Sequence, residues 1–133
     1  ENYEKRIPIA RENFIRAEKE EQITLLEGDA KDVLETLTEP FDLIFMDAAK
    51  GQYLNFLPRV LELLQPEGIL ISDNVLQDGD IIESRFAVTR RNRTIHKRMR
   101  EYLYTLTHSE ELTTAVLPVG DGITISTKKG RKA

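Results

Sequence analysis

Amphipathic segments and short apolar runs alternate along most of the 133-residue chain. Apolar residues at helical spacing in a charged background predict a helix over about residues 8–19, with Pro8 in its first turn. The β-branched run at residues 23–26 predicts a strand, and a short helix is expected over residues 32–37. The chain therefore opens with a helix, a strand and a second helix.

Two near-continuous apolar runs follow, at residues 42–47 and 69–72, with an amphipathic segment at 53–64 between them. Such runs are typical of strands that are buried on both faces of a parallel sheet. The segment between them predicts a helix, and Pro-Glu-Gly at residues 66–68 predicts a turn before the second strand. Strands alternating with helices indicate βαβ units.

The last third of the chain changes this pattern. A helix is expected over residues 92–106, and then two strands at 112–117 and 123–127 joined by the short loop 118–122. A connection this short can only join antiparallel neighbours, so a hairpin is added to the parallel strands. We expect an α/β fold with a mixed sheet, within one domain or part of one.

Composition narrows the chemistry that the chain can perform. The chain has no cysteine, which excludes disulfides, thiolate metal sites and cysteine nucleophiles, so a metal would need oxygen or imidazole ligands. We see no membrane span and no signal peptide, and a cytoplasmic location is the default expectation.

Charge is unevenly distributed along the chain. The net charge is −4, yet no acidic residue lies between Glu83 and Glu101. Seven basic residues fall in that interval: Arg85, Arg90, Arg91, Arg93, Lys97, Arg98 and Arg100. Such a run suits a phosphate-binding surface, and it suits a solvated helix face equally well.

Polar side chains follow the two apolar runs at the point where each strand is expected to end. Asp47 follows the first run, and Asp73 and Asn74 follow the second. Ligands of parallel sheets bind at the carboxyl ends of strands, where these oxygens would suit Mg²⁺. The alternative is that they are only turn or helix-capping residues. We favour the metal site, because three such residues occur together at the ends of two strands.

Further candidates lie near the same edge. Lys50, three residues after Asp47, could act as a general base toward an acceptor hydroxyl, or could be a solvated loop lysine. Asp29 and Ala30 follow the first predicted strand, where an adenine ring could approach. Glu1 could bind ribose hydroxyls if it ends a preceding strand, and otherwise has no role.

Three strings of the sequence, at residues 42–50, 71–75 and 118–122, occur in an order that resembles the metal-dependent O-methyltransferases of the catechol and caffeoyl-CoA type. Residues 47–53, residues 73–76 and the arginine-rich stretch more closely resemble the bacterial tRNA 5-hydroxyuridine methyltransferases, over essentially the whole chain. Both likenesses imply a Rossmann-like sheet that is parallel with an antiparallel last strand.

The resemblance also implies roles for individual residues. Asp47, Asp73 and Asn74 would hold Mg²⁺ or another divalent cation, and Lys50, together with Asp47, would be catalytic. The cofactor would be S-adenosylmethionine, bound by Glu1, Asp29, Ala30 and Asp47. The tRNA likeness implies an RNA-binding set made of Arg85, Arg90, Arg91, Arg93 and Lys97.

The chain departs from the family pattern in two places, and each departure changes what we expect of its activity. Residues 1–133 would be the carboxy-terminal portion of a single methyltransferase domain, without the first strand and the glycine-rich cofactor loop that precede the ribose acid. Catechol enzymes place a carboxylate near the start of the penultimate strand, where this chain has threonines and an alanine at residues 113–115. Catechol itself is therefore not the expected acceptor.

The leading expectation is that the complete protein methylates the 5-hydroxyl of 5-hydroxyuridine at the tRNA wobble position, as a homodimer. One alternative is an O-methyltransferase for small phenolic or catechol-like acceptors, with the arginines merely solvated. Another is a non-catalytic fragment in a swapped assembly, because half of the cofactor site would be missing.

Overall fold

The computed structural model describes residues 1–76 and 93–130 of the chain. The chain divides into two compact units, residues 1–38 and residues 39–133. The expectation that residues 1–133 are the carboxy-terminal portion of one domain stays a prediction.

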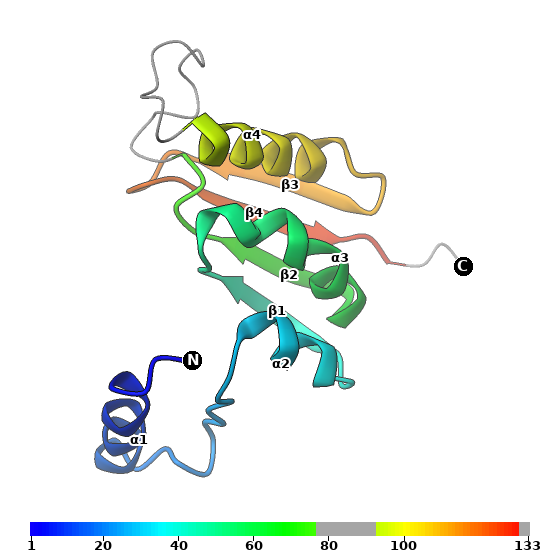
Figure 1. The fold of residues 1–133 in the computed structure, drawn as a ribbon. Helices are drawn as coiled ribbons and strands as arrows, with labels where there is room; N and C mark the ends of the chain where they lie inside the picture. Colours follow the sequence, from blue (N-terminus) through cyan, green and yellow to red (C-terminus); the bar gives the residue numbers. More distant parts are fainter. Residues whose placement is uncertain (77–92, 131–133) are drawn as a thin grey trace. The chain divides into compact units, whose positions relative to one another are not determined.

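The first unit contains two helices, α1 (Arg6–Arg16) and α2 (Ala30–Thr36), which begin about two residues earlier than predicted (Figure 1). The predicted strand at residues 23–26 is wrong, because the described chain there forms no ladder of paired residues. The amino terminus of Glu1 donates to the Leu26 carbonyl at 3.0 Å, and the Gly28 amide donates to the Glu1 carbonyl at 3.0 Å. These two bonds make a single bridge, whereas a strand requires a ladder of them.

The second unit is built on a four-stranded sheet in the order β1-β2-β4-β3 (Figure 1). Its strands are β1 (Phe41–Met46), β2 (Leu64–Ser72), β3 (Leu112–Leu117) and β4 (Ile123–Lys128). β1 and β2 are parallel, and β4 is antiparallel to both β2 and β3. The predicted mixed sheet and its closing hairpin are confirmed.

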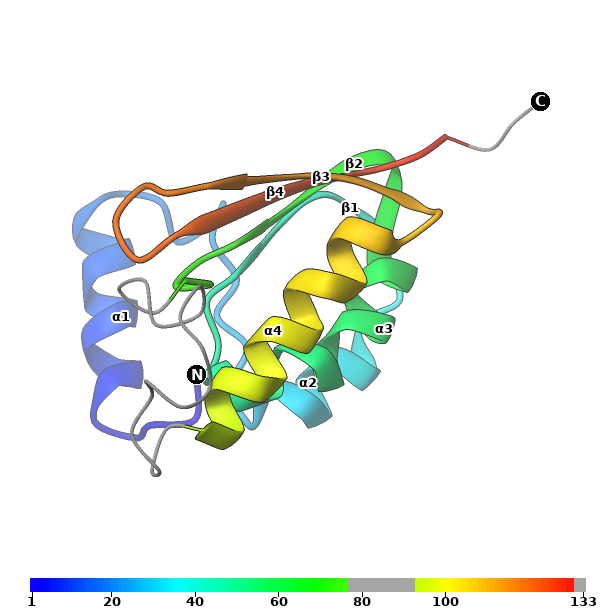
Figure 2. The ribbon, with the colours of Figure 1, turned by 90° about the horizontal axis from the view of Figure 1, so that it is seen from above.

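Two helices cover one face of this sheet (Figure 2): α3 (Tyr53–Leu63), which follows the 3₁₀ turn η1 (Lys50–Gln52), and α4 (Arg93–His108). Both helices were predicted to within two residues. The buried apolar side chains between helices and sheet form the core: Met46, Tyr53, Leu57, Val60, Leu64, Leu70, Val75, Met99, Tyr102, Leu106 and Leu112.

β1 is not buried on both faces, so that prediction is wrong. Side chains alternate between the faces of a strand. Met46 is buried in the core, whereas Leu43 and Phe45 point to the other face and expose 54% and 56% of their surface. In the second unit α3 and α4 pack on the face where Met46 lies, so the apolar side chains of the opposite face gain no cover from these helices.

The turn predicted at residues 66–68 is instead an irregularity within β2. Between Leu64 and Ile69, β2 advances five residues while β1 advances two, and Glu67 adopts a left-handed φ of 68°. A side chain at Gly68 would approach the Gln65 carbonyl oxygen to 2.8 Å. The glycine therefore lets the strand start at Leu64 and return to register.

Candidate functional site

The carboxyl ends of β1 and β2 lie side by side, because Met46 and Ser72 are paired in the parallel ladder. The backbone N–H of Asp73 continues this pairing and donates to the Met46 carbonyl at 3.0 Å. Asp47 and Asp73 are the residues that directly follow the two strands. The structure thus brings these two predicted site residues to one edge of the sheet.

Tyr53, at the start of α3, joins the two strand ends. Its hydroxyl donates to the backbone carbonyl of Asp73 at 2.7 Å. Burial is the main cause that raises the pKa of Tyr53 to about 12; the negative charges of Asp47 and Asp73 act in the same direction, and a backbone hydrogen bond from Ala48 opposes them. The hydroxyl of Tyr53 thus holds the backbone of Asp73 beside the start of α3.

A second buried tyrosine supports the first. The ring of Tyr102 on α4 packs edge-on against Tyr53 with 5.2 Å between ring centroids. Its hydroxyl shares a short hydrogen bond with Ser72, the last residue of β2, and burial raises the pKa of Tyr102. The end of β2 is thus held by hydroxyl groups from both helices.

Asn74 is held in a conformation that few residues adopt. Its φ is +55°, in the left-handed region where asparagine is enriched. Its backbone N–H donates to Asp73 Oδ1 at 2.7 Å, and its side-chain Nδ2 donates to Oδ2 of Asp121 at 3.1 Å. Asp121 belongs to the loop between β3 and β4, so the hairpin also reaches this edge.

The donor set at this edge fits a hard divalent cation. It offers the carboxylates of Asp47 and Asp73 and the amide oxygen of Asn74, and Asp47 is exposed while the other two are half-buried. Mg²⁺ typically takes one or two protein carboxylates and keeps open positions for water and substrate. Among residues 1–76 and 93–130, no three His, Cys, Asp or Glu side chains are grouped to hold a metal.

Lys50 begins η1 and is half-buried, three residues after Asp47. The turn is anchored from α4, since Nη1 of Arg98 donates to the Gly51 carbonyl at 3.1 Å. Arg98, one of the arginines of the basic run, therefore helps to hold the turn that carries Lys50. The role of Lys50 as a base stays a prediction.

The predicted RNA-binding set is only partly visible. Arg93 and Lys97 lie exposed on the first turns of α4, and the ammonium of Lys97 lies 3.8 Å from the Glu101 carboxylate. Arg85, Arg90 and Arg91 fall outside the described residues. The structure therefore does not test whether the five predicted RNA-binding residues lie on one surface.

Three of the predicted cofactor ligands lie together in the first unit. The bond from Gly28 to Glu1 brings Glu1 beside Asp29 and Ala30. The Tyr3 amide donates to Glu1 Oε1 at 2.9 Å and holds the pKa of that carboxyl below its usual value. Asp29 caps α2, because its Oδ1 accepts from the Lys31 amide at 2.9 Å.

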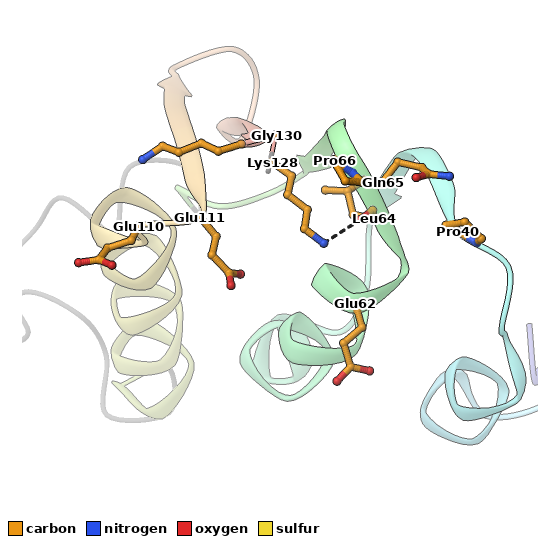
Figure 3. A pocket seen from close by; sticks show the side chains of 10 residues that line it. Pro40, Glu62, Leu64, Gln65, Pro66, Glu110, Glu111, Lys128 and Gly130 are labelled. Atoms are coloured by element: carbon orange, nitrogen blue, oxygen red, sulfur yellow. Dashed lines mark hydrogen bonds between the residues drawn. The ribbon is translucent and has the colours of Figure 1, made fainter. Parts of the chain in front are cut away.

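A hollow of about 580 Å³ lies elsewhere on the second unit (Figure 3). Pro40, before β1, and Leu64, at the start of β2, line it, so it lies at the amino ends of the parallel strands. Nζ of Lys128 donates there to the carbonyls of Leu61 and Leu64, at 2.6 and 2.9 Å. Lys128 thus caps the end of α3, and the candidate site lies at the opposite, carboxyl ends of β1 and β2.

The open α/β sheet with its mixed strand directions is the fold of the Rossmann-like methyltransferases. The family model described as O-methyltransferase matches residues 1–129, and the chain belongs to this family. A caffeoyl-CoA O-methyltransferase of Eucalyptus globulus is 34% identical over 94% of the chain and 52% of its own length. A catechol O-methyltransferase of Niastella koreensis is 35% identical over 59% of the chain and 38% of its own length.

Solved structures agree with the predicted fold. The SAH-bound methyltransferase PaMTH1 of Podospora anserina is 30% identical with a TM-score of 0.83, over 97% of the chain and 58% of its own. An O-methyltransferase of Bacillus cereus in complex with SAH is 27% identical with the same TM-score of 0.83, over 97% and 60%. The chain spans about half the length of the curated caffeoyl-CoA relatives that it matches.

The comparisons do not support the tRNA acceptor that we expected from the sequence. The relatives just named are caffeoyl-CoA and catechol O-methyltransferases, which points to the small-molecule alternative. In the part of the chain that the structure describes, no helix is long and apolar enough to cross a membrane.

The sequence did not single out two residues of the site, Tyr53 and Asp121. Tyr53 stands six residues after Asp47, at the start of an amphipathic helix, and Asp121 stands between two glycines of the hairpin loop. An aspartate between glycines was a usable signal, because such a loop can approach another backbone closely.

Proposed function

We propose that the full-length protein transfers a methyl group from S-adenosylmethionine to a hydroxyl of a small phenolic acceptor, with a divalent cation held by Asp47, Asp73 and Asn74. The observation that carries this proposal is the pairing of Met46 with Ser72, which sets Asp47 beside Asp73. Family membership and the SAH-bound neighbours support the methyl-transfer chemistry.

The residues of this chain would have distinct tasks in that reaction. When bound, the cation supplies Lewis-acid polarisation of the acceptor hydroxyl. Nζ of Lys50 takes the proton of that hydroxyl, the oxygen forms the bond to the methyl carbon, and the carbon–sulfur bond breaks with its electron pair going to sulfur. Tyr53 keeps the two strand ends together, so that the donors stay in place.

A cation with open positions favours an acceptor that offers two adjacent oxygens, and this is why we propose a vicinal dihydroxyphenyl group. The absence of a carboxylate at residues 113–115 argues that any second contact to the acceptor differs from that in catechol enzymes. A tRNA acceptor is kept as a second candidate, because Arg93 and Lys97 are exposed on α4.

The test is methyl transfer from labelled S-adenosylmethionine by the full-length protein. We expect methylation of a 3,4-dihydroxyphenyl compound, little with its 4-hydroxy analogue as the matched control, and none with undermodified tRNA. The variant R93A/K97A should leave the small-molecule rate unchanged.

Two results would contradict this proposal in different ways. Methylation of tRNA alone, lost in R93A/K97A, would move the acceptor to RNA. Failure with every acceptor under conditions where S-adenosylmethionine binds would reject the phenolic and the tRNA proposals together.

A further inference from the structure

Asp121 lies in the loop between β3 and β4 and contacts the segment that follows β2. Its backbone carbonyl accepts from the Leu76 amide at 2.8 Å, and the Gly122 carbonyl accepts from the Val75 amide at 3.1 Å. Its carboxylate Oδ2 accepts from Nδ2 of Asn74 at 3.1 Å. Three hydrogen bonds thus dock the hairpin loop against three successive residues.

The docking is close enough to require glycine at one point. Gly122 has a φ of +86°, and any side chain there would collide with Leu76. Val75, between the two contacts, is fully buried. Two backbone hydrogen bonds and the close approach to Leu76 therefore hold the loop, and with it the carboxylate of Asp121, against the segment that follows β2.

This contact decides which way the Asn74 amide faces. An aspartate carboxylate at neutral pH only accepts hydrogen bonds, so Asn74 must present its NH₂ group to Asp121. A half-turn of the amide would set its oxygen against the carboxylate and lose the bond. With the nitrogen committed to Asp121, Oδ1 of Asn74 faces the other way.

We propose that Asp121 is a positioning residue that fixes Oδ1 of Asn74 as a ligand for the divalent cation. The inference rests on the proposed function, since it assigns a role toward the same cation. A side-chain amide has one oxygen and one nitrogen, and only the oxygen binds a hard cation. Partners that orient a metal ligand in this way typically change metal affinity by roughly 10- to 100-fold.

The test measures Mn²⁺ binding to the full-length protein, by calorimetry or by the electron paramagnetic resonance signal of the free ion, without cofactor or acceptor. We expect D121N to weaken binding by about 10- to 100-fold, because either group of the new amide can face Asn74 and its orientation is lost. D42N, which changes an exposed aspartate on β1, is the matched control for charge and should bind as the wild type does.

A mutant cycle separates positioning from a direct effect of the Asp121 charge. In the N74A background, D121N should have no further effect on Mn²⁺ affinity. N74D alone should weaken the contact by setting two carboxylates together, and N74D/D121N should recover much of the affinity by restoring one donor and one acceptor. Thermal unfolding of each variant shows whether the fold is kept, and the recovery in the swapped pair holds as a test even if D121N is less stable.

Each other outcome is decisive. If D121N binds Mn²⁺ as tightly as the wild type while N74A does not, the inference is overturned and the cation site stands. If D121N is equally harmful with and without Asn74, Asp121 acts on the cation directly and the positioning role is overturned. If the wild type binds no Mn²⁺, the cation of the proposed function is rejected and the inference falls with it.

Discussion

At the scale of single residues, buried hydroxyl groups hold the ends of the strands that carry the candidate ligands. Tyr53 bonds the Asp73 carbonyl, and Tyr102 bonds Ser72 one residue earlier. Both phenols are buried by more than 98% and have raised pKa values because burial disfavours their charged forms. In its neutral form the Tyr53 hydroxyl bonds the Asp73 carbonyl, and the Tyr102 hydroxyl bonds the side chain of Ser72.

These two pKa shifts predict a fall in stability at alkaline pH. An unfolded tyrosine ionises near pH 10, whereas Tyr53 keeps its proton until about pH 12. The native state then binds more protons than the unfolded state, so the contribution of these tyrosines to the free energy of unfolding falls as pH rises above about 10 and is constant at lower pH.

Urea unfolding at pH 9 and pH 11 measures this effect. The loss between the two pH values should be smaller in Y53F/Y102F than in the wild type, and unchanged in Y104F, which alters an exposed tyrosine. An equal loss in all three proteins would contradict the account of the buried hydroxyls.

The candidate metal ligands could be predicted from the sequence, but the hydrogen bonds that fix their positions could not. Asp47, Asp73 and Asn74 could be found because they follow apolar runs, and the ends of parallel strands meet at one edge. Asp121 contacts Asn74 across 47 residues, and Tyr53 contacts Asp73 across 20. Such contacts depend on how elements pack, which the periodicity of one chain does not specify.

At the scale of elements, α3 has no glycine or side-chain cap within its own sequence at its carboxyl end. Lys128 of β4 supplies the cap, since its ammonium donates to the carbonyl of Leu61 and also to that of Leu64, the bond drawn in Figure 3. A cation is favoured there by the helix dipole as well. The contact ties the last strand to the first helix of the second unit.

We therefore expect K128M to lower the free energy of unfolding by about 1.5 to 3 kcal/mol, the range for hydrogen bonds from a charged donor. K129M changes the exposed neighbouring lysine and should cost under about 0.5 kcal/mol. Urea denaturation at neutral pH compares the two. Equal losses would show that the carbonyl contacts add nothing beyond surface charge.

Most elements could be predicted from hydrophobic periodicity, and each error has a physical cause. Residues 23–26 lack the ladder that a strand needs, and Gly68 allows β2 to bulge where a turn was expected. β1 has the apolar composition of a doubly covered strand, yet Leu43 and Phe45 are exposed. The composition of a strand shows that its side chains are apolar enough to be buried, but the elements packed against each face determine which of them are buried.

At the scale of the whole molecule, the chain carries the O-methyltransferase fold over roughly half the length of its curated relatives. Its candidate groups fall in two units: Glu1, Asp29 and Ala30 in the first, and Asp47, Lys50, Asp73 and Asn74 in the second. The reaction proposed here requires both sets and belongs to the full-length protein.

The central claim is that oxygen ligands at the ends of β1 and β2 hold the cation that methyl transfer needs. The most direct test follows methyl transfer to a dihydroxyphenyl acceptor by the full-length protein, before and after chelation and on return of Mg²⁺, in the wild type, D73A and D42N. We predict that chelation abolishes transfer, that Mg²⁺ restores it in the wild type and D42N, and that D73A loses activity by roughly 100-fold or more. Undiminished transfer in chelator, or full activity in D73A, would contradict the account.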